Sequence, residues 1–237
     1  MRAALLRRAA VVFAALALTA GLAACSSSTP DSTPSATKSA AALPTGTTGA
    51  AHFDDDYLAV GTGKTTVDTY VDPMCPFCGE FEKVNGRTLA ELVNSDEITL
   101  RVHPLDFLDR SSQGTMYSSR AGSALTCVAA SDPKATLTFL SQLYENQPEE
   151  GSSGLTDAKL TSLAHDVGAT DVDACIAANK YVTWISNLTQ KALNGPLPGA
   201  DITSITATPT VLVNGHAYTG GITDTKALTK FIAAGGK

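Results

Sequence analysis

Two cysteines separated by two residues, Cys75 and Cys78, are the side chains of this sequence best suited to chemistry. They follow a β-like run that ends near Val71, and they open a segment with helical spacing. A Cys-x-x-Cys pair can close into a disulfide with little rearrangement. Pro76 suits the first position of a helix, because its fixed φ fits there and its missing N–H would be unpaired anyway. The sequence therefore places the pair at a helix N-terminus.

This position predicts different roles for the two sulfur atoms. Cys75 would face free backbone N–H groups and the positive end of the helix dipole, which favour a thiolate over a thiol. We therefore expect Cys75 to be the attacking thiol of a thiol–disulfide exchange and Cys78, one turn further on, to be the resolving thiol. Asp72, in the turn before the pair, is a candidate proton carrier.

A zinc site and a purely structural disulfide are the alternatives for this pair. Zinc needs three or four ligands, and the chain has no second Cys or His pair at ligand spacing, so no metal is expected. The structural disulfide stays open, although a proline and an aromatic residue between strand and helix favour redox work. No cofactor is expected either, because Gly63-Lys64-Thr65 lacks the second glycine and the helix of a phosphate loop.

Residues 1–24 have the pattern of an export signal. A positive region with Arg2, Arg7 and Arg8 precedes an apolar run over residues 9–20, which is too short for a comfortable membrane span. Leu22-Ala23-Ala24-Cys25 resembles the lipobox of bacterial lipoproteins, which implies cleavage before Cys25 and a lipid on its sulfur. Residues 25–50, rich in Ser, Thr, Pro and Ala, are predicted to be a disordered linker. We therefore expect an exported protein held at the outer face of the bacterial cytoplasmic membrane by this lipid.

Five cysteines are an odd number for an exported protein. Lipidation of Cys25 would leave four, and the closeness of Cys75 to Cys78 then favours a second, structural bond between Cys127 and Cys175. Closing so long a loop would contribute roughly 3–5 kcal/mol to stability. The alternative, two free buried thiols, is disfavoured in an oxidising compartment.

The charge of the chain restricts its partners. Removing residues 1–24 takes away three arginines and no acid, so the formal charge of −6 becomes −9. An acidic protein of this kind is not expected to bind nucleic acid or to hold a membrane through a basic patch. The lipid would then be its only membrane attachment.

Periodicity and turn residues predict an ordered series of elements. Strands are expected at 53–60, 65–71 and 98–103, with a helix at 76–93 between the last two. Asp68 is expected to be solvated or bound within a hairpin. Helices follow at 114–130, 135–146, 157–167 and 171–193, the last opening with a capping box from Thr170 to Asp173. A hairpin then joins strands 210–213 and 216–219 at Asn214-Gly215, before a closing helix at 224–233.

This order is that of an α/β thioredoxin-like fold with an inserted helical domain. Over about residues 52–237 the chain resembles the DsbA-like branch of the thioredoxin superfamily, through Cys75-Pro76-Phe77-Cys78 and Ala207-Thr208-Pro209-Thr210. The resemblance implies that Pro209 follows a cis bond and lies against the cysteine pair, and that the backbone of Thr208 pairs with an extended substrate. Residues 51–112 and 196–237 would form the thioredoxin-like domain, and residues 113–195 the insertion.

The resemblance implies a protein disulfide oxidoreductase that donates its disulfide to exported cysteine-containing polypeptides and is reoxidised by a quinone-coupled membrane partner. The alternatives are a disulfide isomerase or reductase of the same fold and a non-catalytic thioredoxin-like binding lipoprotein. Two departures from the family bear on this choice. Thr69 stands where many members have a buried acid, and Phe77 supplies no positive charge beside the sulfur atoms, so the redox potential stays open.

Overall fold

The computed structural model describes residues 42–237, which belong to one compact unit. The predicted signal peptide of residues 1–24, Cys25 and the predicted linker up to residue 41 lie outside the described residues. Within residues 42–237, no helix combines the length and apolar character needed to cross a membrane.

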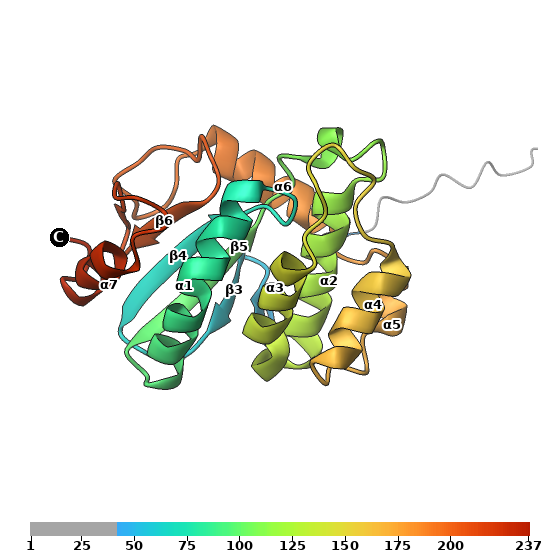
Figure 1. The fold of residues 1–237 in the computed structure, drawn as a ribbon, viewed down its shortest axis with the longest axis horizontal. Helices are drawn as coiled ribbons and strands as arrows, with labels where there is room; N and C mark the ends of the chain where they lie inside the picture. Colours follow the sequence, from blue (N-terminus) through green and yellow to red (C-terminus); the bar gives the residue numbers. More distant parts are fainter. Residues whose placement is uncertain (1–41) are drawn as a thin grey trace, which may run out of the picture. The chain divides into compact units, whose positions relative to one another are not determined.

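A seven-stranded mixed sheet forms the centre of this unit (Figure 1). Its spatial order is β1-β2-β3-β5-β4-β6-β7. Strands β4 and β5 are parallel, with Thr65 opposite Ile98, and the other neighbours are antiparallel. The strands are β1 (Thr47–Thr48), β2 (Ala51–His52), β3 (Tyr57–Val60), β4 (Thr65–Val71), β5 (Ile98–Pro104), β6 (Thr210–Val213) and β7 (His216–Ala217).

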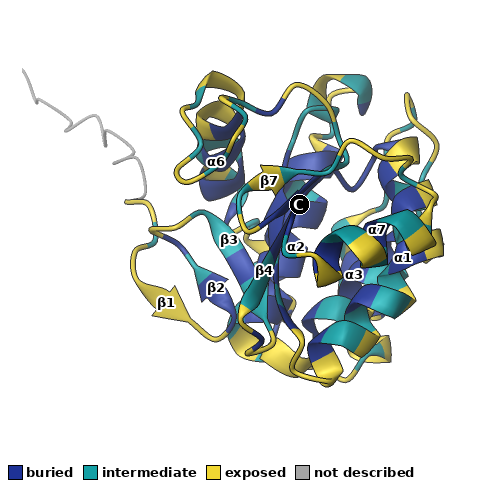
Figure 2. Cartoon of the chain, turned by 90° about the vertical axis from the view of Figure 1, so that its left-hand side faces the viewer, coloured by how far each residue is buried: buried dark blue, intermediate teal, exposed yellow. Residues whose placement is uncertain are grey.

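Helices cover both faces of the sheet. Helix α6 lies on one face and helices α1 and α7 on the other, while α2 to α5 form a group beside the sheet next to α1 (Figures 1 and 2). The helices are α1 (Pro76–Asn94), α2 (Tyr117–Ser131), α3 (Thr136–Glu145), α4 (Asp157–Asp166), α5 (Asp173–Ala177), α6 (Val182–Asn194) and α7 (Thr225–Ala233), with 3-10 turns η1 (Asp109–Ser111) and η2 (Pro133–Ala135). The helical region between β5 and β6 agrees with the predicted thioredoxin-like fold with a helical insertion.

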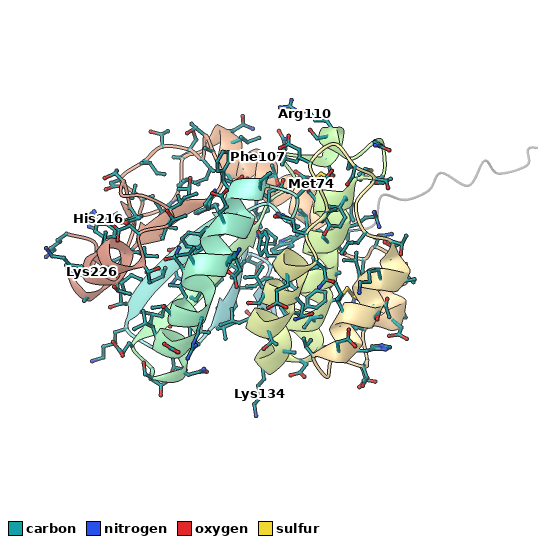
Figure 3. The ribbon with its side chains drawn as sticks, viewed as in Figure 1. Met74, Phe107, Arg110, Lys134, His216 and Lys226 are labelled. Carbon is teal, nitrogen blue, oxygen red and sulfur yellow. A yellow bond between two sulfur atoms is a disulfide. The ribbon has the colours of Figure 1, made fainter. Side chains whose placement is uncertain are left out.

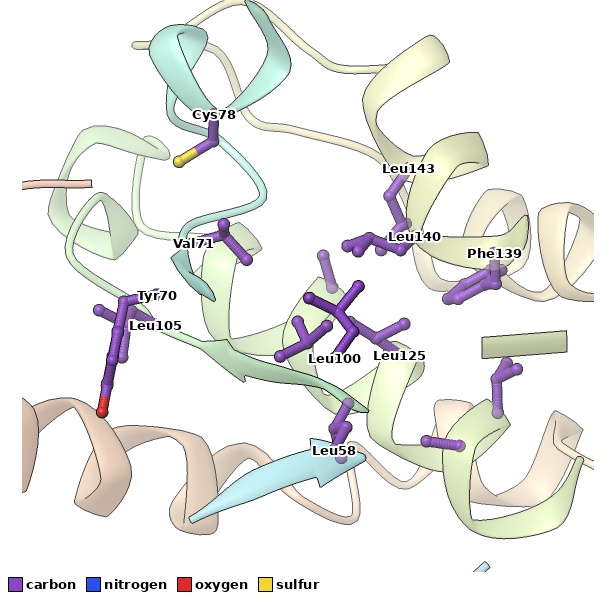
Figure 4. Close-up of a cluster of buried hydrophobic side chains, with 14 of the residues drawn as sticks. Leu58, Tyr70, Val71, Cys78, Leu100, Leu105, Leu125, Phe139, Leu140 and Leu143 are labelled. Carbon is purple, nitrogen blue, oxygen red and sulfur yellow. The ribbon is translucent and has the colours of Figure 1, made fainter. Parts of the chain in front are cut away.

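The core joins the sheet to both groups of helices. Strand β4 is buried from Val67 onwards because it lies between β5 and β6 and is covered on both faces. Cys78 and Val71 belong to the same cluster of buried apolar side chains as Leu100 of β5 and Leu140 of α3 (Figure 4). The helical insertion therefore shares one core with the cysteine pair.

The N-terminal boundary of the ordered part differs from the prediction. The linker was expected to extend to residue 50, but Thr47 and Thr48 pair with Ala51 and His52 as the edge of the sheet. Tertiary packing explains this, because Ala50 is buried and its N–H donates to the carbonyl oxygen of Ala129 on α2 (2.8 Å). The composition of this segment gave no sign of that contact.

The long helix predicted over residues 171–193 is wrong in its continuity. It is divided into α5 and α6 at Asn179, which has a left-handed φ of 48°. Tyr181 follows the break, and its ring stacks on Phe53 with ring centroids 5.2 Å apart. The capping box is also absent, because Val172 is the N-cap of α5 and makes no side-chain cap bond.

Candidate active site at the start of helix α1

Cys75 is the N-cap of helix α1, and Pro76 follows as its first helical residue. Its side chain is mostly buried, with 6% of the residue exposed, and no capping side chain competes for the first N–H groups of the helix. A hydrogen bond from the Cys78 thiol, another from the Thr208 hydroxyl and the backbone N–H groups of Cys78 and Phe77 lower the pKa of Cys75 to about 6, against the opposing effect of burial. The Cys75 sulfur is therefore largely ionised at neutral pH.

Cys78 lies one turn further into the helix and is fully buried. Burial raises its pKa well above the ordinary value, and its hydrogen bond to the Cys75 sulfur adds to this effect. The backbone N–H of Asp72 points at its sulfur atom from 3.4 Å. Both cysteines are in the dithiol form in this structure. The pair therefore combines one stabilised thiolate with one protonated thiol.

The second motif of the sequence lies against this pair. The peptide bond between Thr208 and Pro209 is cis, and the carbonyl oxygen of Thr208 lies 3.4 Å from Cys75 Sγ. Both residues are half-buried at the start of β6. Gly195–Pro196 is a second cis peptide bond, which no sequence pattern predicted.

Asp72 lies at the end of β4 and is completely buried. Its carboxylate accepts three hydrogen bonds, from Met74 N (2.8 Å), Leu108 N (2.9 Å) and Ser118 Oγ (2.6 Å). Burial raises the pKa of Asp72 to about 7, although these three donors oppose the shift. The carboxyl group can therefore gain or lose a proton near neutral pH.

Side chains of the helical insertion donate hydrogen bonds to the backbone of the active-site loop. The Tyr144 hydroxyl donates to the carbonyl oxygen of Asp72 (3.2 Å), and Gln147 Nε2 donates to the carbonyl oxygens of Pro73 (3.0 Å) and Cys75 (2.9 Å). Met74, from the same loop, and Phe107, from the segment after β5, lie at the end of the molecule where α1 begins (Figure 3). These contacts join segments more than 30 residues apart, so sequence reasoning had no signal for them.

Pro76 and Phe77 are the outward-facing residues of the motif. Both are exposed, and Phe77 has 60% of its surface accessible. Met116, left-handed at the start of α2, is another exposed large apolar residue, with 47% of its surface accessible. The Cys75 sulfur is therefore close in the chain to an exposed aromatic side chain, that of Phe77.

Asp68 corrects one expectation, since it is neither solvated nor bound within a hairpin. Asp68 is 8% exposed and lies on the face of β4 opposite to that of Thr69. Its Oδ1 atom lies 3.0 Å from Nε2 of His103 on β5. His103 Nδ1 lies 2.7 Å from the carbonyl oxygen of Asp56, so both ring nitrogens face acceptor oxygens. The ring also stacks on Tyr70, with centroids 4.0 Å apart. This cluster lines a cavity of about 650 Å³ on the face away from the cysteine pair.

The two remaining cysteines of the described residues are bonded to each other. Cys127 of α2 and Cys175 of α5 are joined by a disulfide, with their Cα atoms 5.9 Å apart. In residues 42–237, no three His, Cys, Asp or Glu side chains come together as a metal site. Cys25 lies outside the described residues.

Comparisons with known proteins agree with this geometry. A family model described as "Thioredoxin" matches residues 61–234. The reduced form of the disulfide bond oxidoreductase DsbG from Mycobacterium tuberculosis superposes with a TM-score of 0.66 and 31% identity, over 76% of this chain and 87% of that chain. Reduced DsbA from the same organism has a TM-score of 0.61 and 28% identity, over 76% of this chain and 99% of that chain. The oxidoreductase MdbA from Actinomyces oris, at 21% identity and a TM-score of 0.59, over 76% of this chain and 88% of that chain, shows the shared fold.

A different kind of relative matches over a shorter stretch. The chain is 38% identical over 120 residues to the serine/threonine-protein kinase PknE of Mycobacterium tuberculosis, which is 49% of this chain and 21% of the kinase. The chain thus spans about a fifth of the length of this curated relative. Since the family model covers well over half of the sequence, the chain belongs to the thioredoxin family, as a DsbA-like member of the thioredoxin superfamily of thiol–disulfide oxidoreductases.

Proposed function

We propose that this protein donates a disulfide to exported cysteine-containing polypeptides through Cys75 and Cys78. The observation that carries the proposal is the opposite perturbation of two neighbouring thiols: the pKa of Cys75 is lowered to about 6, while that of Cys78 is raised well above its ordinary value. A stabilised Cys75 thiolate favours the reduced enzyme, and this makes the oxidised enzyme a strong oxidant.

The exchange has two steps. A client thiolate attacks Sγ of Cys75 in the oxidised enzyme, the Cys75–Cys78 bond breaks, and Cys78 leaves with the electron pair and takes up a proton. The second client thiolate then attacks the client sulfur of the mixed disulfide, and Cys75 leaves as a thiolate. The client loses two electrons and gains a disulfide, and the enzyme becomes the dithiol.

Asp72 is proposed to carry the proton for Cys78. Its carboxyl group is buried beside the active-site loop, its own N–H lies 3.4 Å from the Cys78 sulfur, and its pKa of about 7 allows proton transfer in both directions near neutral pH. This position lies three residues before Cys75. The buried Thr69, where many family members have their acid, donates from Oγ1 to the carbonyl oxygen of Arg101 (3.4 Å) instead.

The surrounding residues are proposed to receive the client. The backbone of Thr208 lies beside Cys75, just before β6, where an extended chain could pair as an added strand, and Pro209 follows Thr208 through the cis bond. Pro76 and Phe77 provide an exposed apolar surface next to the sulfur atom. The Cys127–Cys175 bond is proposed to be structural, because it joins two helices of the insertion, α2 and α5.

The cellular setting is a separate part of the proposal. We propose export by residues 1–24, a lipid on Cys25 as the membrane anchor, residues 25–46 as a linker, and reoxidation by a quinone-coupled membrane protein. The basic start and apolar run of the sequence and the Leu22-Ala23-Ala24-Cys25 motif support this setting. Mass spectrometry of the membrane fraction tests it, since the mature chain should begin at an acylated Cys25.

The reduction potential of the Cys75–Cys78 pair tests the proposed direction of the reaction. It is measured by equilibrating the protein in glutathione buffers of graded ratio, with Cys127 and Cys175 left intact. A value near that of DsbA, about −120 mV, is expected for a disulfide donor, whereas a value near that of thioredoxin, about −270 mV, would assign a reductase. A pair that resists reduction until the protein unfolds would be a structural disulfide in a binding protein.

A further inference from the structure

The side chain of Gln147 connects the helical insertion to both ends of the active-site loop. Gln147 follows helix α3, and its two amide hydrogens are directed at the carbonyl oxygens of Pro73 (3.0 Å) and Cys75 (2.9 Å). The Cys75 carbonyl oxygen also accepts from Cys78 N (3.0 Å) and Gly79 N (3.1 Å), the first hydrogen bonds of helix α1. The Cys75 carbonyl oxygen therefore accepts hydrogen bonds both from the first turn of helix α1 and from a side chain of the insertion.

Gly79 provides a second observation, independent of these hydrogen bonds. It lies in the first turns of helix α1, where glycine costs about 1 kcal/mol relative to alanine. A Cβ atom placed on Gly79 would lie 2.2 Å from Gln147 Oε1 and 3.1 Å from its amide carbon. The missing side chain of Gly79 therefore makes room for the Gln147 amide, which lies directly over the helix.

We infer that Gln147 is a positioning residue for Cys75: its amide fixes the junction of loop and helix so that the sulfur atom stays over the first N–H groups of helix α1. This inference rests on the proposed role of Cys75 as the attacking thiol. The thiolate is stabilised by the Cys78 thiol, by the Thr208 hydroxyl and by the backbone N–H groups of Cys78 and Phe77. These donors act over short distances, so a loop that can shift weakens each of them.

The other contacts that hold the active-site loop lie at Asp72 and not at Pro73 or Cys75. The Tyr144 hydroxyl reaches the Asp72 carbonyl oxygen, and the Asp72 carboxylate is held by Ser118 and Leu108, so these contacts anchor the end of strand β4. Among the side chains of the described residues, that of Gln147 is the one that donates to the Pro73 and Cys75 carbonyl oxygens. Replacing Gln147 should therefore change the position of Cys75 more than that of Asp72.

The test is the pH dependence of Cys75 alkylation in the reduced full chain, with iodoacetamide as the probe and Cys75 followed by peptide mass spectrometry. Gln147→Leu, of similar size but without donors, should move the midpoint to higher pH by about 0.7, the equivalent of one hydrogen bond, and slow alkylation at pH 6 roughly threefold. Gln142→Leu is the matched control, because Gln142 lies on helix α3, five residues before Gln147, and donates to the exposed Glu145 carboxylate instead. It should keep the wild-type midpoint.

Gly79→Ala provides an independent variant, because it should displace the Gln147 amide while improving the helix propensity of α1. It should move the midpoint in the same direction as Gln147→Leu, and it should add nothing in the Gln147→Leu background. Thermal melting of each variant establishes that it is folded. Wild-type midpoints in both folded variants would overturn the inference while leaving the proposed function intact. A wild-type midpoint near the ordinary value for cysteine would overturn the proposed function itself.

Discussion

The Cys75 sulfur lies 3.4 Å from the carbonyl oxygen of Thr208, a residue 133 positions later in the chain. Strand β6 carries Thr208 to this place because it pairs with β4, the strand that leads into the active-site loop. The sheet therefore brings the proposed nucleophile and the backbone proposed to pair with a client together. Contacts of this kind define the chemistry of the site more than either segment does alone.

The hydrogen bond from Cys78 is the largest influence that lowers the pKa of Cys75. Cys78→Ala should therefore move the midpoint of Cys75 alkylation from about pH 6 toward its ordinary value of 9.0. The measurement is the alkylation rate across a pH series that brackets both values. A variant that still reacts with a midpoint near 6 would show that the helix terminus and Thr208 are sufficient.

The two cysteines should respond differently to substitution by serine. Cys75→Ser should abolish oxidation of a dithiol peptide, because the fully buried Cys78 has no partner with which to form the disulfide that a client attacks. Cys78→Ser should form mixed disulfides with client proteins and accumulate them, because no resolving thiol is present. Non-reducing gels of cells that express each variant test this. Full activity in the Cys75→Ser protein would rule out the proposed mechanism.

Asp72 should make the stability of the reduced protein fall as pH rises. Its folded pKa of about 7 lies above the ordinary value of 3.8, so its contribution is fully present below pH 3.8 and is lost as pH rises to 7. The shift corresponds to at most about 4 kcal/mol. Asp72→Asn should remove this decline, measured as the free energy of unfolding in urea at mildly acidic and at mildly alkaline pH.

Both proteins in that comparison should carry Cys75→Ser, because the lowered pKa of Cys75 makes a contribution of the opposite sign between about pH 6 and pH 9. The amide of the Asp72→Asn variant would offer one acceptor oxygen to three donors, so this variant should be less stable overall. The difference between the two pH values is therefore the informative quantity. An equal decline in both proteins would assign the titration to another group.

The Cys127–Cys175 bond should affect stability without affecting the redox pair. It closes a loop with a sequence separation of 48 residues, so replacing both cysteines with alanine should cost about 4 kcal/mol in the free energy of unfolding. Urea unfolding under non-reducing conditions measures this loss. The alkylation midpoint of Cys75 should stay unchanged, and a shifted midpoint would show that the insertion transmits strain to the active site.

Elements with local signals could be predicted from the amino-acid sequence. Strand β4, helix α1 and strand β6 begin where the periodicity and Pro76 predicted, because hydrophobic spacing and proline geometry act within a few residues. The position of Cys75 at a helix N-terminus followed from the same local signals. The thioredoxin-like order with a helical insertion followed from the succession of these elements.

The partners of these elements depend on tertiary packing and could not be predicted in this way. The break at Asn179, the early sheet edge at Thr47 and the burial of Asp68 against His103 depend on neighbours far along the chain. The same is true of Gln147, whose amide meets residues 72 and 74 positions earlier. Local propensity acts over a few residues, whereas tertiary packing determines which distant groups come into contact. The pKa values of a buried site depend on those contacts, so they could not be predicted from local sequence.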